Sequence, residues 1–409
     1  MKKNNITNIT IKLNKFGQVK YLNDCILHEI NSGNNKIDVN VEDSFSASNI
    51  CAPIAGIIDY YRNNGVQVYV KCPRGSYANH VRIYNPIAIE ELSENDYAPF
   101  DKVFSFSSEE GVKTIVDMYS LALRQGDELE KGVIQSLEWC MNEAIDNVLQ
   151  HSTSNKGFVM AQQYKQNKSF SFCVFDSGIG IYNSLHDSKH SPPTPLVAIQ
   201  MAMKERITRD ETIGQGNGLW GLSQIIKETN GKLLISSGGA RYEFINGQES
   251  TVSSGDFNLG KEHGTTMIDF QLDYSSPIDV AAVLNGYALI DFWLEQHEND
   301  KGEFVFDVGQ ESNGTGIRKS AERTRNIIIN ALKEQYSTIV LDFKNVSMLS
   351  SSFADELIGK LIAQLGFSRF MQYIVVQNLN EFNSAIVNRS VGQRMAQIFM
   401  DETINEEDE

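Results

Sequence analysis

The chain has 409 residues, and its 36 Lys and Arg residues against 52 Asp and Glu residues give a net charge of −16 at pH 7. Hydrophobic residues make up 41% and charged residues 22%, a composition that excludes a wholly disordered chain. The acidic excess disfavours a nucleic-acid-binding body, because binding to phosphate backbones relies on Lys and Arg. At about 150 residues per domain, the length predicts two or three domains.

The cysteines and the apolar runs indicate the compartment. Five cysteines stand far apart and form no Cys-x-x-Cys pair, which argues against structural zinc and fits a reducing cytosol: Cys25, Cys51, Cys72, Cys140 and Cys173. The N-terminus lacks the apolar core of a signal peptide, and no run approaches the roughly 18 to 20 apolar residues of a membrane span. We therefore expect a cytoplasmic protein that binds neither membranes nor nucleic acids.

Residues 1–100 predict a small α/β domain. Short runs at residues 7–13, 36–41 and 66–71 have the composition of strands, and residues 49–62 have that of a helix. The polar, proline-containing stretch at residues 85–102 predicts a linker or covering loop.

Residues 101–275 predict a second domain that begins with helices. Two amphipathic segments lie between residues 111 and 152, and strands are expected at residues 157–163 and 169–175. A long loop and another helix follow, and the domain ends with strands at residues 232–236 and 265–272.

Residues 276–400 predict a third, α/β domain. Strand-like runs at residues 303–309, 338–343 and 372–378 alternate with helical patterns at residues 318–336 and 351–365. The acidic residues 401–409 predict a solvated, frayed tail. A weak internal repeat aligns Asp38 with Asp342 and Ser48 with Ser352, although two generic strand–turn–helix units explain it equally well.

Three motifs in the middle block carry the chemistry. The first is DSGIG, where Asp176 follows a predicted strand and Gly178 and Gly180 follow Asp176. A carboxylate at a strand end can accept a hydrogen bond from an exocyclic amine such as that of adenine, and the glycines let the backbone approach a flat ring. A strand-ending turn with a satisfied Asp explains this motif alone at least as well.

The second motif is GQGNGLWGL, with Gly214, Gly216 and Gly218 before Leu219. Alternating glycines free backbone N–H groups to converge on an anion, and a helix beginning there adds its positive dipole end. No strand immediately precedes the motif, so a dinucleotide fingerprint is disfavoured. A lid over phosphates and a merely flexible loop both remain open.

The third motif, NEAIDN, places Glu143 and Asn147 four residues apart, on one face of a helix. The amide oxygen of Asn147 is a suitable ligand for Mg²⁺, and Glu143 could act as a general base. A solvent-exposed helix face is an equally good explanation of this pair alone.

Together and in this order, the three motifs resemble those of the GHKL superfamily, which includes histidine-kinase-type ATPases and anti-sigma-factor serine kinases. The resemblance covers roughly residues 110–275. It implies a Bergerat-type two-layer α/β sandwich that binds ATP and Mg²⁺. The positions that match the family's nucleotide-binding residues are Asn147, Asp176, Gly178, Gly180, Gly214, Gly216, Gly218, Leu219 and Thr265.

The resemblance also implies a role for each motif. Glu143 would be the catalytic base, Asn147 would hold Mg²⁺ and Asp176 would bind adenine. Residues 181–213 would form the lid, from which Lys204, Arg206 and Arg209 could reach the γ-phosphate, although a solvated helix face explains these cations as well.

Residues 339–359, IVLDFKNVSMLSSSFADELIG, resemble the STAS-like fold of anti-sigma-factor antagonists. In that family a serine at the start of a helix accepts phosphate from a GHKL kinase, and Ser352 is the matching position. The sequence departs from the pattern at Ser350, where an Asp is usual, and at Phe353, where a Gly is usual. A simple helix cap formed by the serines is the favoured alternative.

The sequence therefore predicts a Bergerat-type domain flanked by smaller STAS-like α/β domains, the N-terminal one less clearly so. We expect an ATP-dependent partner-switching regulator that binds a protein partner or forms a homodimer, with serine/threonine kinase activity as one form of it. The alternatives are an ATPase whose hydrolysis gates conformation or dimerisation, and a module that binds ATP without hydrolysing it. A sensor histidine kinase is disfavoured, because His28 and Glu29 lie in no recognisable phosphoacceptor helix.

Overall fold

The computed structural model of the chain divides into two compact units. Unit 1 comprises residues 1–120 and 135–289, and unit 2 comprises residues 121–134 and 290–409. The described residues are 6–42, 45–92, 98–151, 156–186, 188–205, 218–255, 257–259, 264–287, 289, 291–334 and 336–407, without the side chains of residues 149–151, 292 and 398–407. Both units mix helices and strands, as the sequence predicts. The domain boundaries that the sequence predicts near residues 100, 275 and 400 stay predictions.

Unit 1 begins with a βαβαβ segment, residues 7–71, which we call the N-terminal module. Its elements are β1 (Thr7–Lys12), α1 (Gly17–Asn31), β2 (Lys36–Glu42), α2 (Ser48–Asn63) and β3 (Gln67–Lys71). The strands are parallel and lie in the order β1-β2-β3. The predicted strands and α2 are confirmed, whereas α1 was not predicted, although Val19, Leu22 and Ile26 form a buried stripe along it.

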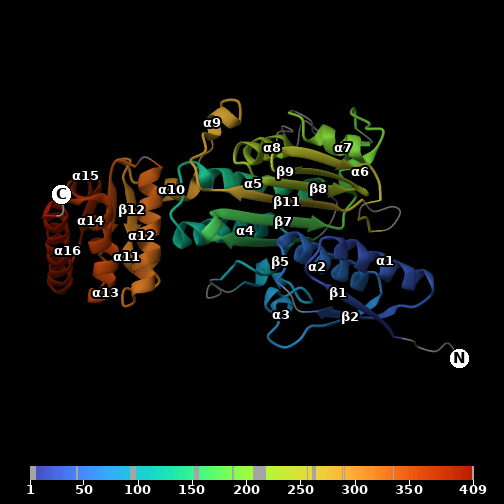
Figure 1. The fold of residues 1–409 in the computed structure, drawn as a ribbon, viewed down its shortest axis with the longest axis horizontal. Coiled ribbons are helices and arrows are strands. Elements are labelled where there is room, and N and C mark those ends of the chain that lie inside the picture. The colour runs from blue at the N-terminus through green and yellow to red at the C-terminus, as the bar shows by residue number, and fades with distance from the viewer. Residues whose placement is uncertain are drawn as a thin grey trace. The chain divides into compact units, whose positions relative to one another are not determined.

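The rest of unit 1 is built on an eight-stranded sheet with the order β10-β9-β8-β11-β7-β6-β5-β4 (Figure 1). Within this sheet, β4 and β5 are the only parallel neighbours among the described strands. The strands are β4 (Ile87–Ala88), β5 (Val103–Phe106), β6 (Gly157–Tyr164), β7 (Ser169–Asp176), β8 (Lys232–Ser237), β9 (Ala240–Ile245), β10 (Gln248–Val252) and β11 (Thr266–Asp273). The four strands predicted between residues 157 and 272 are confirmed, and β9 and β10 were not predicted.

Helices and short turns complete unit 1. They are α3 (Tyr77–Val81), η1 (Ile89–Glu91), α4 (Glu109–Gly126), α5 (Val133–His151), η2 (Lys165–Asn167), α6 (Gly180–His186), α7 (Pro195–Ala202), α8 (Gly218–Glu228) and α9 (Val280–Val283). The two predicted helices between residues 111 and 152 correspond to α4 and α5. Residues 121–126 of α4 and residues 133–134 of α5 belong to unit 2. Among the described residues, none of the helices has both the length and the apolar composition needed to cross a membrane.

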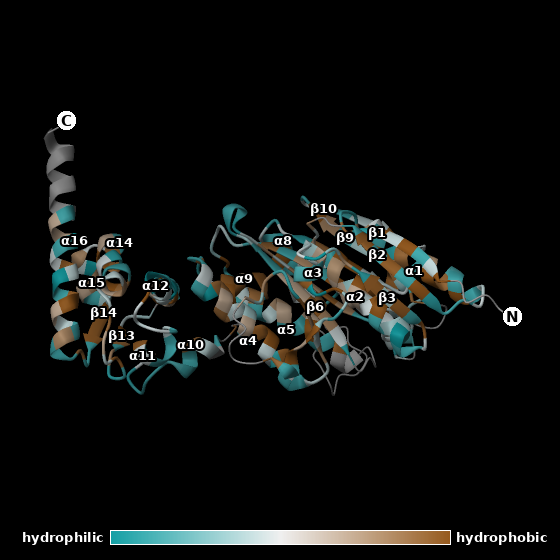
Figure 2. Cartoon of the chain, turned by 90° about the horizontal axis from the view of Figure 1, so that it is seen from below, coloured by the Kyte–Doolittle hydropathy of each residue, from teal (hydrophilic) through white to brown (hydrophobic). Residues whose placement is uncertain are grey.

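The eight-stranded sheet is covered on both faces. On one face, the ring of Tyr119 from α4 packs edge-on against Phe104, Phe170 and Phe172. On the other face, side chains of five strands join the core of the N-terminal module: Val103, Phe158, Met160, Cys173, Phe175, Leu234 and Met267. Figure 2 shows hydrophobic residues concentrated along α2 and the neighbouring strands. The N-terminal module is thus packed onto the back of the sheet, opposite α4.

Helix α2 approaches the sheet closely because Gly56 has no side chain. A methyl group at this position would collide with the ring of Phe175 and would lie 3.1 Å from Phe158. Close packing of this kind buries α2 on nearly all sides, and adding even one methyl group to such a core forces neighbours to shift.

A buried polar cluster fixes the start of α2 on the sheet. The Oγ of Ser48 lies 2.7 Å from Ser171 Oγ and 3.3 Å from Asp269 Oδ1, and Asn49 Nδ2 donates to Asp269 Oδ2 at 3.0 Å. The backbone N–H of Ser48 donates to Gln162 Oε1 at 2.9 Å. Burial raises the pKa of Asp269 to about 7, although the hydrogen bonds from Asn49 and Ser48 act in the opposite direction. This carboxylate therefore titrates at the contact between the N-terminal module and the sheet.

The titration of Asp269 makes unit 1 less stable as the pH rises. Because the folded pKa of about 7 exceeds the ordinary value of 3.8, the folded state holds the proton longer than the unfolded state. We expect the free energy of unfolding to fall by about 2–3 kcal/mol between pH 5 and pH 8 through this group. Asp269→Asn should remove that decrease in urea titrations followed by tryptophan fluorescence. A wild-type slope in the variant would contradict the assignment.

Unit 2 contains a second parallel sheet, in the order β12-β13-β14, within what we call the C-terminal module (residues 304–407). Its strands are β12 (Phe304–Asp307), β13 (Ile339–Asp342) and β14 (Ile374–Gln377). The helices of unit 2 that follow α5 in the chain are α10 (Phe292–Gln296), α11 (Val308–Glu311), α12 (Arg318–Lys333), α13 (Ser351–Ala354), α14 (Lys360–Leu365), α15 (Phe367–Tyr373) and α16 (Glu381–Glu407), with a π-helical turn, η3 (Asp355–Gly359), between α13 and α14.

Two features of unit 2 differ from the sequence prediction. The helix expected at residues 351–365 is interrupted by the π turn, where the carboxylates of Asp355 and Glu356 are engaged by basic side chains. The backbone of α16 also stays helical to Glu407, whereas a frayed tail was expected from residue 401. Glutamate and aspartate do not prevent helix continuation, so an acidic run is weak evidence for a helix end.

The N-terminal and C-terminal modules share a topology. Each has three parallel strands in sequential order, with helices connecting successive strands. The weak repeat pairs Ser48, the first residue of α2, with Ser352 in α13. Their environments differ, because Ser48 is fully buried and Ser352 is only half-buried. The shared topology is what a duplication predicts, and the STAS-like nature of the N-terminal module stays a prediction.

Candidate functional site

Helix α5 carries the first part of the site. Glu143 is half-buried, and burial raises its pKa to about 7, with a further contribution from the negative charge of Asp146. The side-chain amide of Asn147 donates a hydrogen bond to the backbone carbonyl of Glu143, one turn earlier. That bond uses an N–H donor of the Asn147 side chain. The amide oxygen takes no part in it and is the atom of this side chain that can act as an acceptor or a metal ligand.

The start of α8 lies against Glu143. A methyl group at Gly218 would collide with Oε2 of Glu143, so only glycine fits here without a shift of the carboxylate. Leu219, the next residue, is buried. The structure therefore brings the last glycine of GQGNG together with the acidic residue of NEAIDN. Gly214, Gly216, Arg206 and Arg209 lie outside the described residues, and Lys204 is exposed just after α7.

Asp176 is the last residue of β7 and is almost fully buried. Its Oδ1 accepts the backbone N–H of Gly178 at 2.7 Å. In the sheet register Asp176 lies opposite Gly157 on β6, and a methyl group at Gly157 would lie 3.0 Å from Cγ1 of Val148, the residue after Asn147. Asp176 is thus one strand away from the last turns of α5.

The glycine turn after Asp176 packs directly on another stretch of backbone. Gly180 has φ of +75°, and a methyl group there would collide with the carbonyl of Gly264. A methyl group at Gly264 would in turn lie 2.7 Å from the carbonyl oxygen of Ile179. This contact brings Thr265, which is buried, close to the DSGIG turn. Both positions require glycine for a steric reason.

Sequence reasoning missed one residue of this region, Ser237 at the end of β8. Its Oγ accepts the backbone N–H of Ile181 at 2.9 Å and lies 3.4 Å from Thr266 Oγ1. Ser237 thus holds the first turn of α6 to the strands that flank Asp176. The only sequence signal is a serine at a strand end before two glycines, which is too common to single out.

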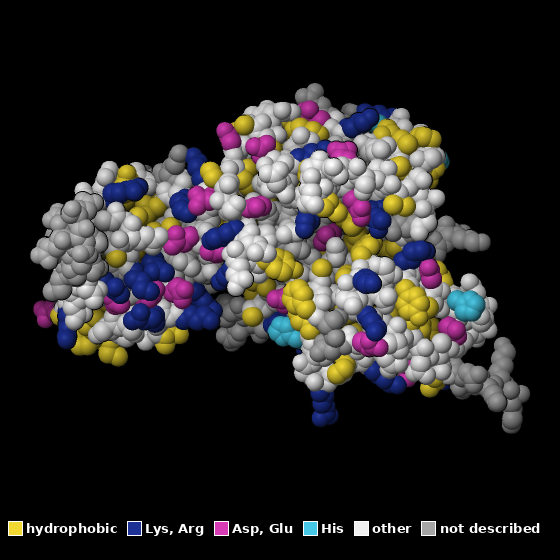
Figure 3. Space-filling view, in the orientation of Figure 1, with side chains coloured by type: hydrophobic (Ala, Val, Ile, Leu, Met, Phe, Trp, Pro, Cys, Tyr) yellow, Lys and Arg dark blue, Asp and Glu magenta, His cyan; other side chains and the backbone are white. Residues whose placement is uncertain are grey.

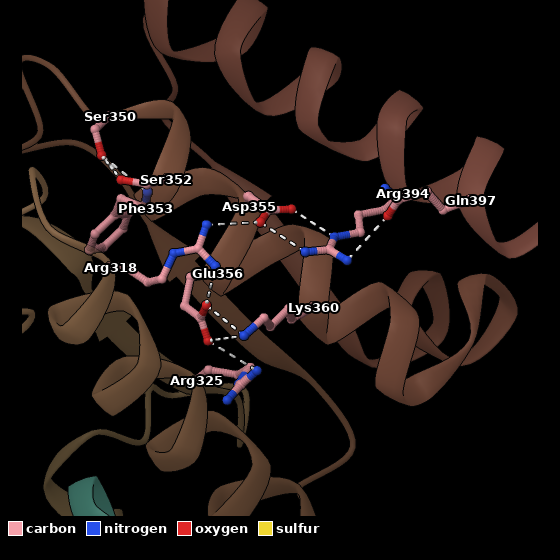
Figure 4. Close-up of polar contacts among 10 residues, drawn as sticks. All are labelled: Arg318, Arg325, Ser350, Ser352, Phe353, Asp355, Glu356, Lys360, Arg394 and Gln397. Atoms are coloured by element: carbon pink, nitrogen blue, oxygen red, sulfur yellow. Dashed lines mark hydrogen bonds and ion pairs between the residues drawn. The ribbon is translucent and has the colours of Figure 1, made fainter.

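Ser352 lies in unit 2. Ser350 is the N-cap of α13, because its Oγ accepts the N–H of Phe353 at 3.1 Å, so the predicted serine cap is confirmed at that residue. The Oγ of Ser352 lies 2.9 Å from that of Ser350 (Figure 4). Ser351 is exposed.

Three large apolar side chains near this serine turn are more than half exposed, namely Ile317, Met348 and Phe382. Hydrogen bonds from side chains to the backbone hold their segments around the turn: Thr315 Oγ1 donates to the carbonyl of Met348 at 2.8 Å, and Asn380 Nδ2 donates to that of Ser347 at 2.9 Å. The turn therefore combines hydroxyl groups with an exposed apolar surface.

A cluster of charges lies one turn further along the helix. Glu356 is 2% exposed and pairs with Arg318 at 3.4 Å, Arg325 at 3.3 Å and Lys360 at 2.7 Å. Figure 3 shows Lys and Arg side chains gathered around a few acidic ones on this module. Three cations around one buried carboxylate offset the cost of burying its charge.

The neighbouring carboxylate of Asp355 is held by Arg394 of α16 through Nε and Nη2, at 2.7 and 2.9 Å (Figure 4). This bidentate contact lowers the pKa of Asp355. Sequence reasoning missed the whole cluster, since its members come from α12, η3, α14 and α16.

Comparison with known families matches residues 320–382 to a STAS-like domain of unknown function (DUF4325). The match begins within α12, includes Ser352 and the charge cluster except Arg318 and Arg394, and ends at the start of α16. It supports the predicted resemblance for this flank alone, and no GHKL ATPase domain was found. A comparison with curated proteins gave no match.

Proposed function

We propose that unit 1 binds ATP with Mg²⁺ in a GHKL-type site and that the chain uses the nucleotide to control a protein interaction, as a partner-switching regulator. The observation that carries this proposal is the packing of Gly218 against the carboxylate of Glu143, because it joins two motifs far apart in the sequence. The position of Asp176 beside Gly157 and the last turns of α5 adds the third motif. The helices α4 and α5 over one face of the sheet would be the helical layer of a Bergerat-type sandwich.

Each residue would then have a defined role. The buried carboxylate of Asp176 would accept the amine of adenine, and the turn at Gly178 and Gly180 would let the purine approach the backbone. The amide oxygen of Asn147 would be one of the few protein ligands of Mg²⁺, which usually keeps waters and phosphate oxygens. The N–H groups at Gly218 and Leu219 open an 11-residue helix, whose positive end would face the phosphates.

The chemistry would be phosphoryl transfer. Glu143 would take the proton of the attacking hydroxyl, the γ-phosphoryl group would leave ADP, and the new bond would form to the oxygen that lost the proton. In a kinase that oxygen belongs to a serine, and the half-buried Ser352 is the position that the sequence offers for it. In an ATPase it belongs to water, and the pKa of Glu143 near 7 suits either acceptor.

Binding of Mg²⁺-ATP tests the site directly. We expect calorimetry to detect Mg²⁺-ATP binding by the full chain, and Asn147→Ala to weaken it at least tenfold, or about 1.4 kcal/mol. The loss should largely disappear when the titration is repeated without Mg²⁺, because the amide acts through the metal. Equal affinity of the variant and the wild type would refute the metal assignment, and no binding by the wild type at millimolar ligand would refute the proposed function.

Labelled ATP separates the three forms of the proposal. With γ-labelled ATP and Mg²⁺, a kinase retains label on protein, and Ser352→Ala should abolish that label while Ser351→Ala, the adjacent control, retains it. Release of free phosphate without labelled protein identifies an ATPase. If ATP binds but neither labelled protein nor free phosphate appears, ATP acts as a ligand that stabilises one conformation.

A further inference from the structure

We infer that Asn330 of α12 is a positioning residue for the nucleotide site: it fixes the connection between α4 and α5 and thereby the helix that carries Glu143 and Asn147. The inference rests on the proposed function for its consequence, but the structural step is independent of it. The chain enters unit 2 within α4 and returns to unit 1 within the first turn of α5. Whatever holds residues 121–134 therefore also holds the start of α5.

Asn330 binds this connection with its whole side chain. It is almost fully buried, and its Nδ2 donates to the carbonyls of Arg124 and Asp127, both at 3.0 Å. Its Oδ1 accepts the backbone N–H of Leu129 at 2.8 Å. The first contact satisfies the carbonyl of Arg124 in the last turn of α4, where carbonyls have no partner within the helix, and the second binds the residue directly after α4. The third fixes the chain four residues before α5 begins.

Other residues of α12 lie on the same stripe and contact the same connection. Asn326 Nδ2 donates to the carbonyl of Gln125 at 3.0 Å, and Lys333 pairs with Glu130 at 2.9 Å. Glu334, directly after α12, accepts the N–H of Gly132 at 3.0 Å. Residues spaced by three, four or seven lie on one face of a helix. This face of α12 therefore contacts residues 124–132.

The same helix also reaches the partly exposed serine turn of the C-terminal module. Arg318 and Arg325 of α12 both bind Glu356, which lies one turn beyond Ser352. One helix thus contacts both the charge cluster next to Ser352 and the connection that leads into α5. Glu143 is ten residues, or about 15 Å, along α5 from Val133. A displacement at Asn330 would be carried to Glu143 along one continuous helix.

Asn330→Ala tests the inference against Asn383→Ala. Asn383 is a matched control, because it is also buried in unit 2 and binds another loop, donating to Val346 O at 2.9 Å and accepting from Leu349 N at 3.1 Å. We expect Asn330→Ala to raise the amide hydrogen-exchange rate of residues 129–147 at least threefold and to weaken Mg²⁺-ATP binding three- to tenfold. The control should leave both quantities within twofold. Asn330→Asp keeps the acceptor for Leu129 but turns a carboxylate oxygen toward the carbonyls of Arg124 and Asp127, so its effects should be at least as large as those of Asn330→Ala.

The two readouts separate the possible failures. Unchanged exchange in residues 129–147 of Asn330→Ala overturns the inference, whether or not ATP binds. Faster exchange with unchanged affinity for Mg²⁺-ATP also overturns it, because α5 would then move without effect on the site. If the wild type itself binds no ATP, the proposed function fails, and exchange still decides whether Asn330 positions α5. Equal effects of Asn330→Ala and Asn383→Ala would also overturn the inference, because Asn330 would then stabilise unit 2 in general without a specific effect on α5.

Discussion

Glu143→Gln should lower the rate of ATP turnover by about 10²- to 10⁴-fold, the usual contribution of a general base. Glutamine keeps the size of the side chain that packs against Gly218 but cannot accept the proton of the attacking hydroxyl. We therefore expect the affinity for Mg²⁺-ATP to stay within about threefold of the wild type, so that the loss falls on kcat. Phosphate release and protein labelling, measured at saturating Mg²⁺-ATP, give the rate.

The pH dependence provides a separate check on Glu143. Burial raises its pKa to about 7, and a base works only when it is deprotonated, so the rate should rise with pH and level off above about pH 8. The negative charge of Asp146 contributes to that pKa. Asp146→Asn should therefore shift the profile to lower pH, an effect that a merely structural role of Glu143 would not produce. A flat profile, or full activity in Glu143→Gln, would refute the role of general base.

Features that depend on local pattern were predictable from the sequence. The strand before DSGIG and the strands β8 and β11 follow from short apolar runs between turns, and α5 follows from its helical spacing. The hairpin of β9 and β10 was missed although Asn246-Gly247, both with positive φ, is a strong hairpin signal. Helix α1 was missed because lysine, asparagine and aspartate obscure its narrow apolar stripe.

The site could be predicted only as a set of motifs. The sequence indicates that Glu143, Asp176 and Gly218 belong to one pattern, but the contact between Gly218 and Glu143 depends on how α5 and α8 pack. The steric need for glycine at Gly264 arises from the backbone of Ile179 and has no local signal. The hydrogen bonds of Asn330 are harder still to predict, since the groups that it contacts belong to the backbone and lie about 200 residues away in the sequence.

Arg124→Met should destabilise unit 2 by about 3–5 kcal/mol, because it leaves one partner of a buried ion pair without the other. Arg124 is 1% and Asp291 7% exposed, and Nη2 of Arg124 lies 2.5 Å from Oδ2 of Asp291. The guanidinium also lies 5.1 Å from the centre of the Trp293 ring. Urea unfolding followed by tryptophan fluorescence, to which Trp293 contributes, should report the loss.

A double-mutant cycle separates the pair from the packing of the arginine. Asp291→Asn keeps a side-chain oxygen for the N-cap contact with the N–H of Leu294, which Asp291 Oδ1 now accepts at 3.0 Å. The double variant with Arg124→Met should be more stable than Arg124→Met alone, because the unpaired buried charge is gone. Lys319→Met, at an exposed position of α12, should change stability by less than about 0.5 kcal/mol. Additive losses in the cycle would show that Arg124 stabilises unit 2 without energetic coupling to Asp291.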